Sequence, residues 1–241
     1  MSSISFENFG KLASTQLSPT ERAGRYRIQV EAEKLVVADV ISKLGLNDQD
    51  DLLDVGCGTG LLLLPLSLIV RSATGIDHAA VIDSLHRSFP GASVATIPGS
   101  FLEISIEAKF SAIVAYSVVH YLSSEDELFA FVEKAAGLLD FGGRLLIGDI
   151  PNVDRKRRFL QTQTGAEFGE AWKERTSASA PPSNQLALTP DPSMLEFGDE
   201  LVVDLIARFR RQGFDTFVLP QSTSLPFGHT REDILVTRPP R

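Results

Sequence analysis

Short apolar runs alternate with longer segments of helical periodicity along most of the chain. The short runs are rich in the aliphatic and β-branched residues typical of buried strands. We expect strands at residues 51–55, 73–77, 93–97, 110–115, 145–149, 214–219 and 233–237. We expect helices over residues 18–44, 61–70, 79–89, 124–139 and 201–209. Because strands and helices alternate with short connections, the pattern predicts right-handed crossovers and a parallel sheet.

The N-terminal part precedes this alternation. Residues 1–17 are polar and mixed, which predicts a loosely held arm. Ser18-Pro19-Thr20-Glu21 combines a capping serine, a proline at the first helical position and a glutamate three residues after the cap, so a helix should start here. Gly45 should end it. We therefore treat residues 1–45 as an arm with a cap helix.

A second irregular stretch follows the fifth expected strand. Residues 154–175 have a charged helical pattern, and residues 176–192 are rich in Ser, Ala and Pro without periodicity. We interpret 152–193 as an insertion in one domain that spans 46–241, because a long segment of this kind in a compact domain is usually functional. Its basic run, Arg155 to Arg158, would either bind an anionic acceptor or form a solvated helix face, and the solvated face is the more common case.

Composition narrows the class of protein. The 241 residues are 43% hydrophobic and 22% charged, as in a globular protein of one large domain. The net charge of −8 argues against a nucleic-acid partner, which would favour a basic face. The only cysteine, Cys57, permits no internal disulfide. With no signal-like start and no apolar run long enough for a bilayer, we expect a cytoplasmic protein without a membrane partner.

Three glycines at alternate positions follow the first expected strand: Gly56, Gly58 and Gly60. Without Cβ atoms in the way, a ligand can lie against such a loop and accept hydrogen bonds from its N–H groups. A dinucleotide loop has the spacing G-x-G-x-x-G, which this chain lacks. A second acid, Asp77, ends the next strand.

The string Leu53-Asp54-Val55-Gly56-Cys57-Gly58-Thr59-Gly60 closely resembles the first motif of class I S-adenosylmethionine-dependent methyltransferases. This resemblance implies a Rossmann-like, doubly wound sheet of seven mostly parallel strands with an antiparallel last strand. It also implies S-adenosylmethionine as the cofactor. The cofactor-binding residues that it suggests are Asp54, Gly56, Cys57, Gly58, Thr59, Gly60, Asp77, His78, Gly99, Ser100, Phe101, Tyr116 and Ser117.

Three of these residues, Asp77, Ser100 and Phe101, would contact the nucleoside part of the cofactor. Asp77 stands where the family binds both ribose hydroxyls, a position that is also compatible with an N-cap of the next helix. The family commonly has an acid after the glycine that follows strand three, where this chain has Ser100. A serine hydroxyl can still accept a hydrogen bond from adenine, and Phe101 could lie against the purine face.

Candidates for the acceptor side come from the less regular parts of the chain. The leading helix often covers the cofactor pocket in this family, so its residues Arg22, Arg25, Tyr26 and Arg27 either contact the methionine end or form a solvated face. A solvated face is the more common outcome for such charges. We predict Tyr26, Tyr121, Phe227 and Arg231 as substrate-binding residues.

The sulfonium methyl needs little activation, so positioning an acceptor should be the main catalytic effect. A hydroxyl acceptor also benefits from a general base, for which His120 and His229 are the candidates, although a loop histidine more often has a structural role. Metal-assisted relatives place acids after strands four and five. Asp149 and Asn152 follow strand five, but Tyr116 and Ser117 follow strand four, so we expect no metal.

Several alternatives stay open. An NAD-linked oxidoreductase would share the strand, loop and Asp77, but not the glycine spacing. A nucleic-acid methyltransferase of the base-amino type would have an Asn/Asp-Pro-Pro-aromatic motif after strand four, which is absent. A methyltransferase-like protein could bind cofactor or a partner without catalysis, and Ser100 supports that reading. We favour O-methylation of a small-molecule acceptor of metabolite or sugar type over N-methylation of a small amine, and a homodimer is possible.

Overall fold

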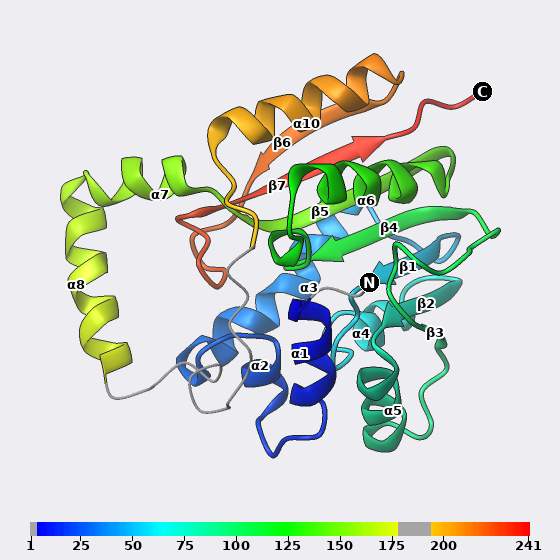
Figure 1. The fold of residues 1–241 in the computed structure, drawn as a ribbon, viewed down its shortest axis with the longest axis horizontal. Coiled ribbons are helices and arrows are strands. Elements are labelled where there is room, and N and C mark those ends of the chain that lie inside the picture. Colours follow the sequence, from blue (N-terminus) through cyan, green and yellow to red (C-terminus); the bar gives the residue numbers. More distant parts are fainter. Residues whose placement is uncertain (1–3, 178–193) are drawn as a thin grey trace.

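The computed structural model describes residues 4–177 and 194–241 of the chain. Its strands form one sheet in the order β3-β2-β1-β4-β5-β7-β6 (Figure 1). The strands are β1 (Asp51–Val55), β2 (Ser72–Asp77), β3 (Ala95–Pro98), β4 (Phe110–Tyr116), β5 (Leu139–Pro151), β6 (Asp215–Pro220) and β7 (Arg231–Thr237). The pairs from β3 to β5 are parallel, whereas β7 is antiparallel to both β5 and β6. The Rossmann-like, seven-stranded fold expected from the sequence is confirmed.

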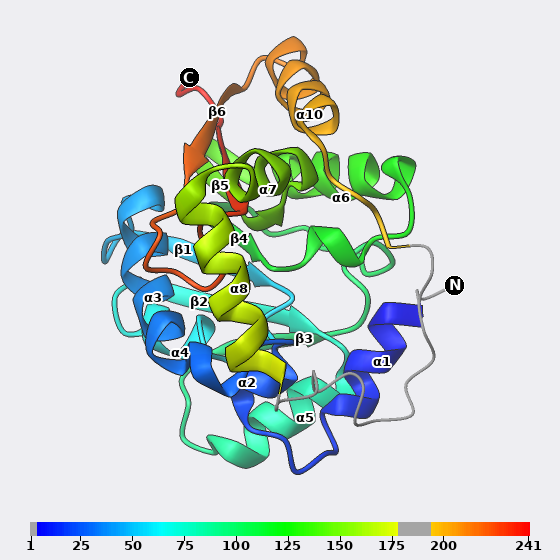
Figure 2. The ribbon, with the colours of Figure 1, turned by 90° about the vertical axis from the view of Figure 1, so that its left-hand side faces the viewer.

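Helices cover both faces of this sheet (Figure 2). The helices are α1 (Ile4–Leu12), α2 (Pro19–Arg22), α3 (Val30–Leu44), α4 (Leu63–Ser67), α5 (Ala79–Ser88), α6 (Glu125–Gly137), α7 (Val153–Leu160), α8 (Gln163–Ser177) and α10 (Asp199–Arg211). Two short 3-10 turns, η1 (Arg27–Gln29) and η2 (Val119–Tyr121), lie before α3 and after β4.

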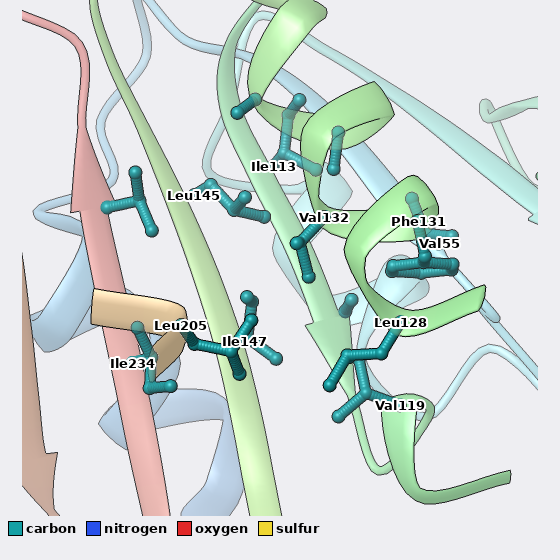
Figure 3. Packing of buried hydrophobic residues seen from close by; sticks show 14 of the residues in the cluster. Val55, Ile113, Val119, Leu128, Phe131, Val132, Leu145, Ile147, Leu205 and Ile234 are labelled. Carbon is teal, nitrogen blue, oxygen red and sulfur yellow. The ribbon is translucent and has the colours of Figure 1, made fainter. Parts of the chain in front are cut away.

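The core has two layers, one on each face of the sheet, because successive side chains of a strand point to opposite faces. Leu53 and Ile113 pack with α6 and α10 on one face, as Figure 3 shows for Ile113 and its neighbours. Leu52 and Ala112 pack with α3, α4 and α5 on the other face. Both faces of the central strands are therefore buried, which explains why their sequences are almost continuously apolar.

The N-terminal part differs from the prediction made from the sequence. Residues 4–12 form α1 instead of a loose arm, and the single helix expected over 18–44 is divided into α2, η1 and α3. Ser18 forms the expected capping box with Glu21. Gly24 then adopts a φ of +76°, which a helix cannot contain, so the chain turns before α3 begins. Gly45 ends α3 in the left-handed conformation, as expected.

Other boundaries also moved. The helix expected over 61–70 is only the short α4, which contains Pro65. Strand β5 begins at Leu139, before the strand expected at 145–149, and its pairing with β4 shifts register between Phe110 and Ala112. The charged segment 154–175 is helical as α7 and α8, and most of the Ser/Ala/Pro-rich stretch lies outside the described residues. None of the helices in the described ranges is both long and apolar enough to cross a bilayer.

Candidate functional site

A pocket of about 420 Å³ opens at the carboxyl ends of β1, β2 and β4. Its walls come from the glycine loop, the segments that follow β3 and β4, and the N-terminal segment from α1 to α3. Ligands of open α/β sheets bind at this edge, so the topology and the predicted cofactor residues agree on one place.

The glycine loop has a backbone that only glycine adopts easily. Gly56, Gly58 and Gly60 have φ values of +78°, +54° and +84°. A Cβ atom on Gly56 would lie 2.5 Å from Val118, and one on Gly60 would lie 2.6 Å from Leu85. The loop therefore requires glycine both for its conformation and for its close packing against neighbouring segments.

Asp77 anchors this loop from the end of β2. Its Oδ2 accepts a hydrogen bond of 2.7 Å from the N–H of Gly58, and its Oδ1 accepts one of 2.7 Å from the N–H of His78. Burial raises the pKa of Asp77, and these two backbone bonds oppose the rise. The side chain of His78 does not line the pocket: its Nδ1 accepts from the N–H of Ala80 and caps α5.

Asp54 and Cys57 form a buried part of the pocket wall. The Oδ2 atom of Asp54 is buried without a hydrogen-bond partner. Burial, and secondarily the nearby Asp77, raise the pKa of Asp54 to about 7. Burial also raises the pKa of the Cys57 thiol, so this cysteine is neutral and unreactive.

The segment after β3 supplies the opposite wall. Phe101 is buried, and its ring centroid lies 4.8 Å from that of Phe131. The carbonyl of Ser100 accepts hydrogen bonds from the N–H groups of Glu103 and Ile104, which forms a tight turn. This turn brings Glu103 to the pocket wall. Sequence reasoning missed Glu103, although the Ser-x-x-Glu spacing was a signal for such a turn.

Two strained residues lie side by side at the ends of β4 and β5. Ser117 and Asp149 have φ values of +59° and +60°, which are unusual for residues with a side chain. The Ser117 hydroxyl donates to Oδ2 of Asp149 and accepts a 3.0 Å hydrogen bond from Nη2 of Arg25. The Oδ1 atom of Asp149 is buried without a hydrogen-bond partner. Strain of this kind concentrates at functional sites.

Arg25 connects the N-terminal segment to these strand ends. Its Nη1 lies 2.6 Å from Oε1 of Glu33, and its Nη2 lies 3.6 Å from Oδ2 of Asp149. Burial lowers the pKa of Arg25, but attraction to Asp149 and Glu33 outweighs this effect and the net shift is upward. The solvated face that we considered more common is therefore wrong for Arg25, which is 7% exposed, whereas the side chain of Arg27 is 79% exposed.

His120 and Tyr121 follow Ser117 on η2. The Nδ1 atom of His120 is buried without a partner, and burial, then the charge of Arg231, lower the pKa of His120 to about 4. Its imidazole is therefore neutral near pH 7 and stacks obliquely against Tyr121 at 4.2 Å. Tyr121 lines the pocket and also contacts Phe9 of α1 edge-on at 4.9 Å.

The loop between β6 and β7 approaches the same strand ends. Nε of Arg231 lies 3.7 Å from Oδ1 of Asp149, and its guanidinium lies 5.1 Å from the ring centre of Phe227. Phe227 contacts Trp172 of α8, which in turn contacts Tyr26. Of the four predicted substrate residues, Arg231 therefore lies beside Asp149 and Tyr121 lines the pocket, whereas Tyr26 and Phe227 pack on Trp172 outside the pocket lining.

His229 does not line the pocket, and it joins this group through Phe168, whose ring stacks on Trp172 at 6.2 Å. Its ring stacks on Phe159 of α7 at 4.5 Å and contacts Phe168 of α8 edge-on at 5.0 Å. Burial and the charge of Arg155 lower its pKa. The structure therefore packs His120 against the pocket-lining Tyr121 and packs His229 in an aromatic cluster of the insertion.

Part of the chain is similar in sequence to known methyltransferases. Residues 52–143 match the family described as methyltransferase domain. The chain is 29% identical to chondramide synthase from Chondromyces crocatus over 65% of its length, but only 4% of that protein is covered. It is also 29% identical to the ubiquinone biosynthesis O-methyltransferase of Methylobacterium nodulans, over 52% of this chain and 49% of that one. The chain thus spans about half the length of this second relative, and much less of the first.

Solved structures show the same fold over nearly the whole chain. The N-methyltransferase NodS from Bradyrhizobium japonicum, in complex with S-adenosylhomocysteine, aligns with a TM-score of 0.59 at 13% identity, covering 98% of this chain and 99% of that one. At that identity the likeness concerns the fold. The matched segment contains the glycine loop and Asp77, and the sheet has the fold of a solved methyltransferase, so this part of the chain is similar to methyltransferase domains.

Proposed function

We propose that the protein transfers the methyl group of S-adenosylmethionine to a hydroxyl of a small-molecule acceptor of metabolite or sugar type. This proposal rests on one observation: residues suited to bind the cofactor and residues suited to bind an acceptor line the same pocket. The glycine loop and Asp77 form one side, and the Arg25–Ser117 pair, held by Asp149, forms another. A cofactor and an acceptor could therefore lie next to each other at the strand ends.

The residues present fit the cofactor. Asp77 offers a carboxylate at the ribose position, and the left-handed glycines hold the loop against the pocket, where its backbone can contact a ligand. The orphaned Oδ2 of Asp54 can accept a hydrogen bond from a ligand amine or from a bridging water. Phe101 and Glu103 would hold the adenine, with Glu103 in place of the acid that position 100 lacks. When bound, the cofactor supplies a methyl group on a sulfonium, which requires an aligned lone pair from the acceptor.

His120 is the best placed base for a hydroxyl acceptor. Its neutral imidazole has a free Nδ1 beside the pocket-lining Tyr121, so it could accept the hydroxyl proton during transfer. Ser117, whose single proton is given to Asp149, can only accept a further hydrogen bond and would orient a donor group of the acceptor. His229 would act through packing, because it is stacked within the aromatic cluster.

The insertion would cover the acceptor. The ring of Trp172 on α8 contacts both Tyr26 and Phe227. These contacts connect the insertion to the N-terminal segment and to the loop between β6 and β7. Helices α7 and α8 project beside the strand ends (Figure 1). Exclusion of water by such a cover would protect the transfer from competing solvent.

Methyl transfer to an amine is the second candidate. The solved relative NodS is an N-methyltransferase, whereas the ubiquinone relative is an O-methyltransferase. The two differ in what they require of the protein: an amine must lose its proton before attack, whereas a hydroxyl must lose it during attack. The position of the His120 ring against the pocket-lining Tyr121 favours the hydroxyl.

A screen with S-adenosylmethionine tests the proposal. The purified protein is incubated with phenol, catechol, a hexose and ethanolamine, and S-adenosylhomocysteine and methylated products are measured by mass spectrometry. We expect methylated oxygen on a hydroxyl probe and loss of most of it in His120→Asn. Methylation of ethanolamine alone would replace the hydroxyl proposal with the amine one. Cofactor binding without transfer to any probe would support a non-catalytic role.

A further inference from the structure

The turn that follows β3 is held at its beginning by β2. Gly99 directly follows β3, and its N–H donates a hydrogen bond of 2.9 Å to the carbonyl of Asp77. The carbonyl of Ser100 then accepts from the N–H groups of Glu103 and Ile104 at 2.9 and 3.1 Å, which closes the turn. The turn lines the pocket from its first residue to Glu103. Its first half is therefore attached to the strand that carries the ribose candidate.

The second half of the turn is held by α6. Nζ of Lys134 on this helix donates hydrogen bonds to the carbonyls of Phe101 and Ile104. A turn without regular structure leaves such carbonyls without a partner from a strand or helix, and one ammonium group has enough N–H groups to bind both. The same Nζ atom lies 5.0 Å from the ring centre of Phe101. Phe131, three residues before Lys134 on the same face of α6, contacts the Phe101 ring at 4.8 Å. Lys134 and Phe131 together fix where Phe101 lies.

We propose that Lys134 is a positioning residue for the base of the cofactor. The proposal rests on the proposed use of S-adenosylmethionine, in which Phe101 and Glu103 hold the adenine. Lys134 does not line the pocket, so it acts through the turn and not by contact with the ligand. The two carbonyls that it binds flank Glu103 in the chain. Lys134 therefore fixes the backbone from which the Glu103 carboxylate reaches the amino group of the adenine.

Discrimination between two bases separates positioning from general support of the fold. S-adenosylhomocysteine has an amino group on its base, which can donate to the Glu103 carboxylate, whereas S-inosylhomocysteine has a carbonyl oxygen at the same place. A site built to bind an N–H group rejects an analogue that lacks it. Displacement of the turn should therefore weaken binding of the adenine ligand and leave the poorer binding of the inosine ligand nearly unchanged. A general loss of stability would weaken the binding of both ligands equally.

Calorimetric titration with both ligands is carried out on the wild type, Lys134→Met, Lys134→Arg and Lys109→Met, together with thermal unfolding of each. Met has a similar length without N–H donors, whereas Arg keeps them. Lys109→Met is the matched control, because Nζ of Lys109 also donates to a backbone carbonyl, but to that of Gly137 and not to the turn. Lys134→Gln, which keeps one amide donor group, replaces Lys134→Met if that variant does not fold.

We expect the wild type to bind S-adenosylhomocysteine about tenfold more tightly than S-inosylhomocysteine. Lys134→Met should bind S-adenosylhomocysteine about tenfold more weakly than the wild type, so its preference for adenine falls to about twofold or less, whereas Lys134→Arg and Lys109→Met should keep the preference. An unchanged preference in Lys134→Met, an equal weakening of both ligands, or a wild type that does not distinguish the two bases would overturn the proposal. Failure of the wild type to bind S-adenosylhomocysteine would instead reject the proposed function.

Discussion

The N–H of Gly58 donates a 2.7 Å hydrogen bond to Oδ2 of Asp77, which joins the glycine loop of β1 to the end of β2. Asp77 therefore has two roles in the proposed site. It would present a carboxylate to the ribose, and it fixes the glycine loop, which we propose lies against the cofactor. Changes in either partner should affect cofactor binding more than they affect the fold.

The first prediction separates two reasons for glycine in the loop. Gly58→Ala meets no atom within 4 Å, so only its left-handed backbone should cost stability, about 1 kcal/mol. Gly56→Ala has the same backbone problem and also a 2.5 Å contact with Val118, which should add about 1–3 kcal/mol. Urea unfolding of both variants measures the difference, and equal destabilisation would contradict this packing argument.

The second prediction concerns the pH dependence of stability through Asp54. The folded protein keeps this carboxyl protonated up to a pKa of about 7, whereas the unfolded chain ionises it near 3.8. Between these values the unfolded state binds fewer protons, so stability contributed by this group falls as the pH rises from about 4 to 7. Asp54→Asn should remove that decline and gain up to about 4 kcal/mol relative to the wild type at pH 7.

Thermal unfolding of Asp54→Asn and the wild type across this range provides the measurement. The exposed Asp83→Asn on α5 is the matched control and should keep the wild-type slope. A wild-type curve parallel to that of Asp54→Asn would show that the Asp54 carboxyl ionises normally in the folded protein.

His120 should make the stability change with pH in the opposite direction to Asp54. Its pKa is about 4 in the folded protein and 6.5 in the reference state, so the unfolded chain binds more protons between these values. Stability from this group is therefore lost as the pH falls from about 6.5 to 4. His120→Asn should flatten that part of the stability curve, and His86→Asn on the exposed side of α5 should not. If the stability of His120→Asn falls at acid pH as steeply as that of the wild type, His120 is solvated in the folded protein.

The fourth prediction compares two arginines of the N-terminal segment. Arg25→Ala would leave Glu33 and Asp149 buried without their shared partner, which should cost about 3–5 kcal/mol. Arg27→Ala removes an ion pair between the exposed Arg27 and Glu21, which should cost less than about 1 kcal/mol. Denaturant unfolding of both variants gives the comparison. Similar values for the two would mean that the Arg25 network is not formed.

The parts of the fold that the sequence predicted depend on local rules. Apolar runs marked the strands, Ser18 and Gly45 marked helix ends, and the loop glycines marked a backbone that other residues avoid. Asp77 could be placed because parallel strands bring their carboxyl ends to one edge. These features require no knowledge of which distant side chains meet.

The parts that were missed depend on distant contacts. Arg25 meets Ser117 across 92 positions of sequence, and nothing near Arg25 distinguishes it from the exposed Arg27. The strain at Asp149 has no sequence signature, since only the fold brings the two strand ends together. Helix α1 did leave a signal, because Phe6 and Phe9 are three residues apart and share one helix face.

The most direct test of the central claim is a calorimetric titration of the purified protein with S-adenosylmethionine, repeated on Asp77→Ala and on the control Asp83→Ala. We expect binding by the wild type and the control, and a loss of about 1–3 kcal/mol in Asp77→Ala, because that variant lacks the carboxylate that binds the ribose and holds Gly58. Absence of S-adenosylmethionine binding by the wild type, or equal affinity in Asp77→Ala, would contradict the assignment of this pocket.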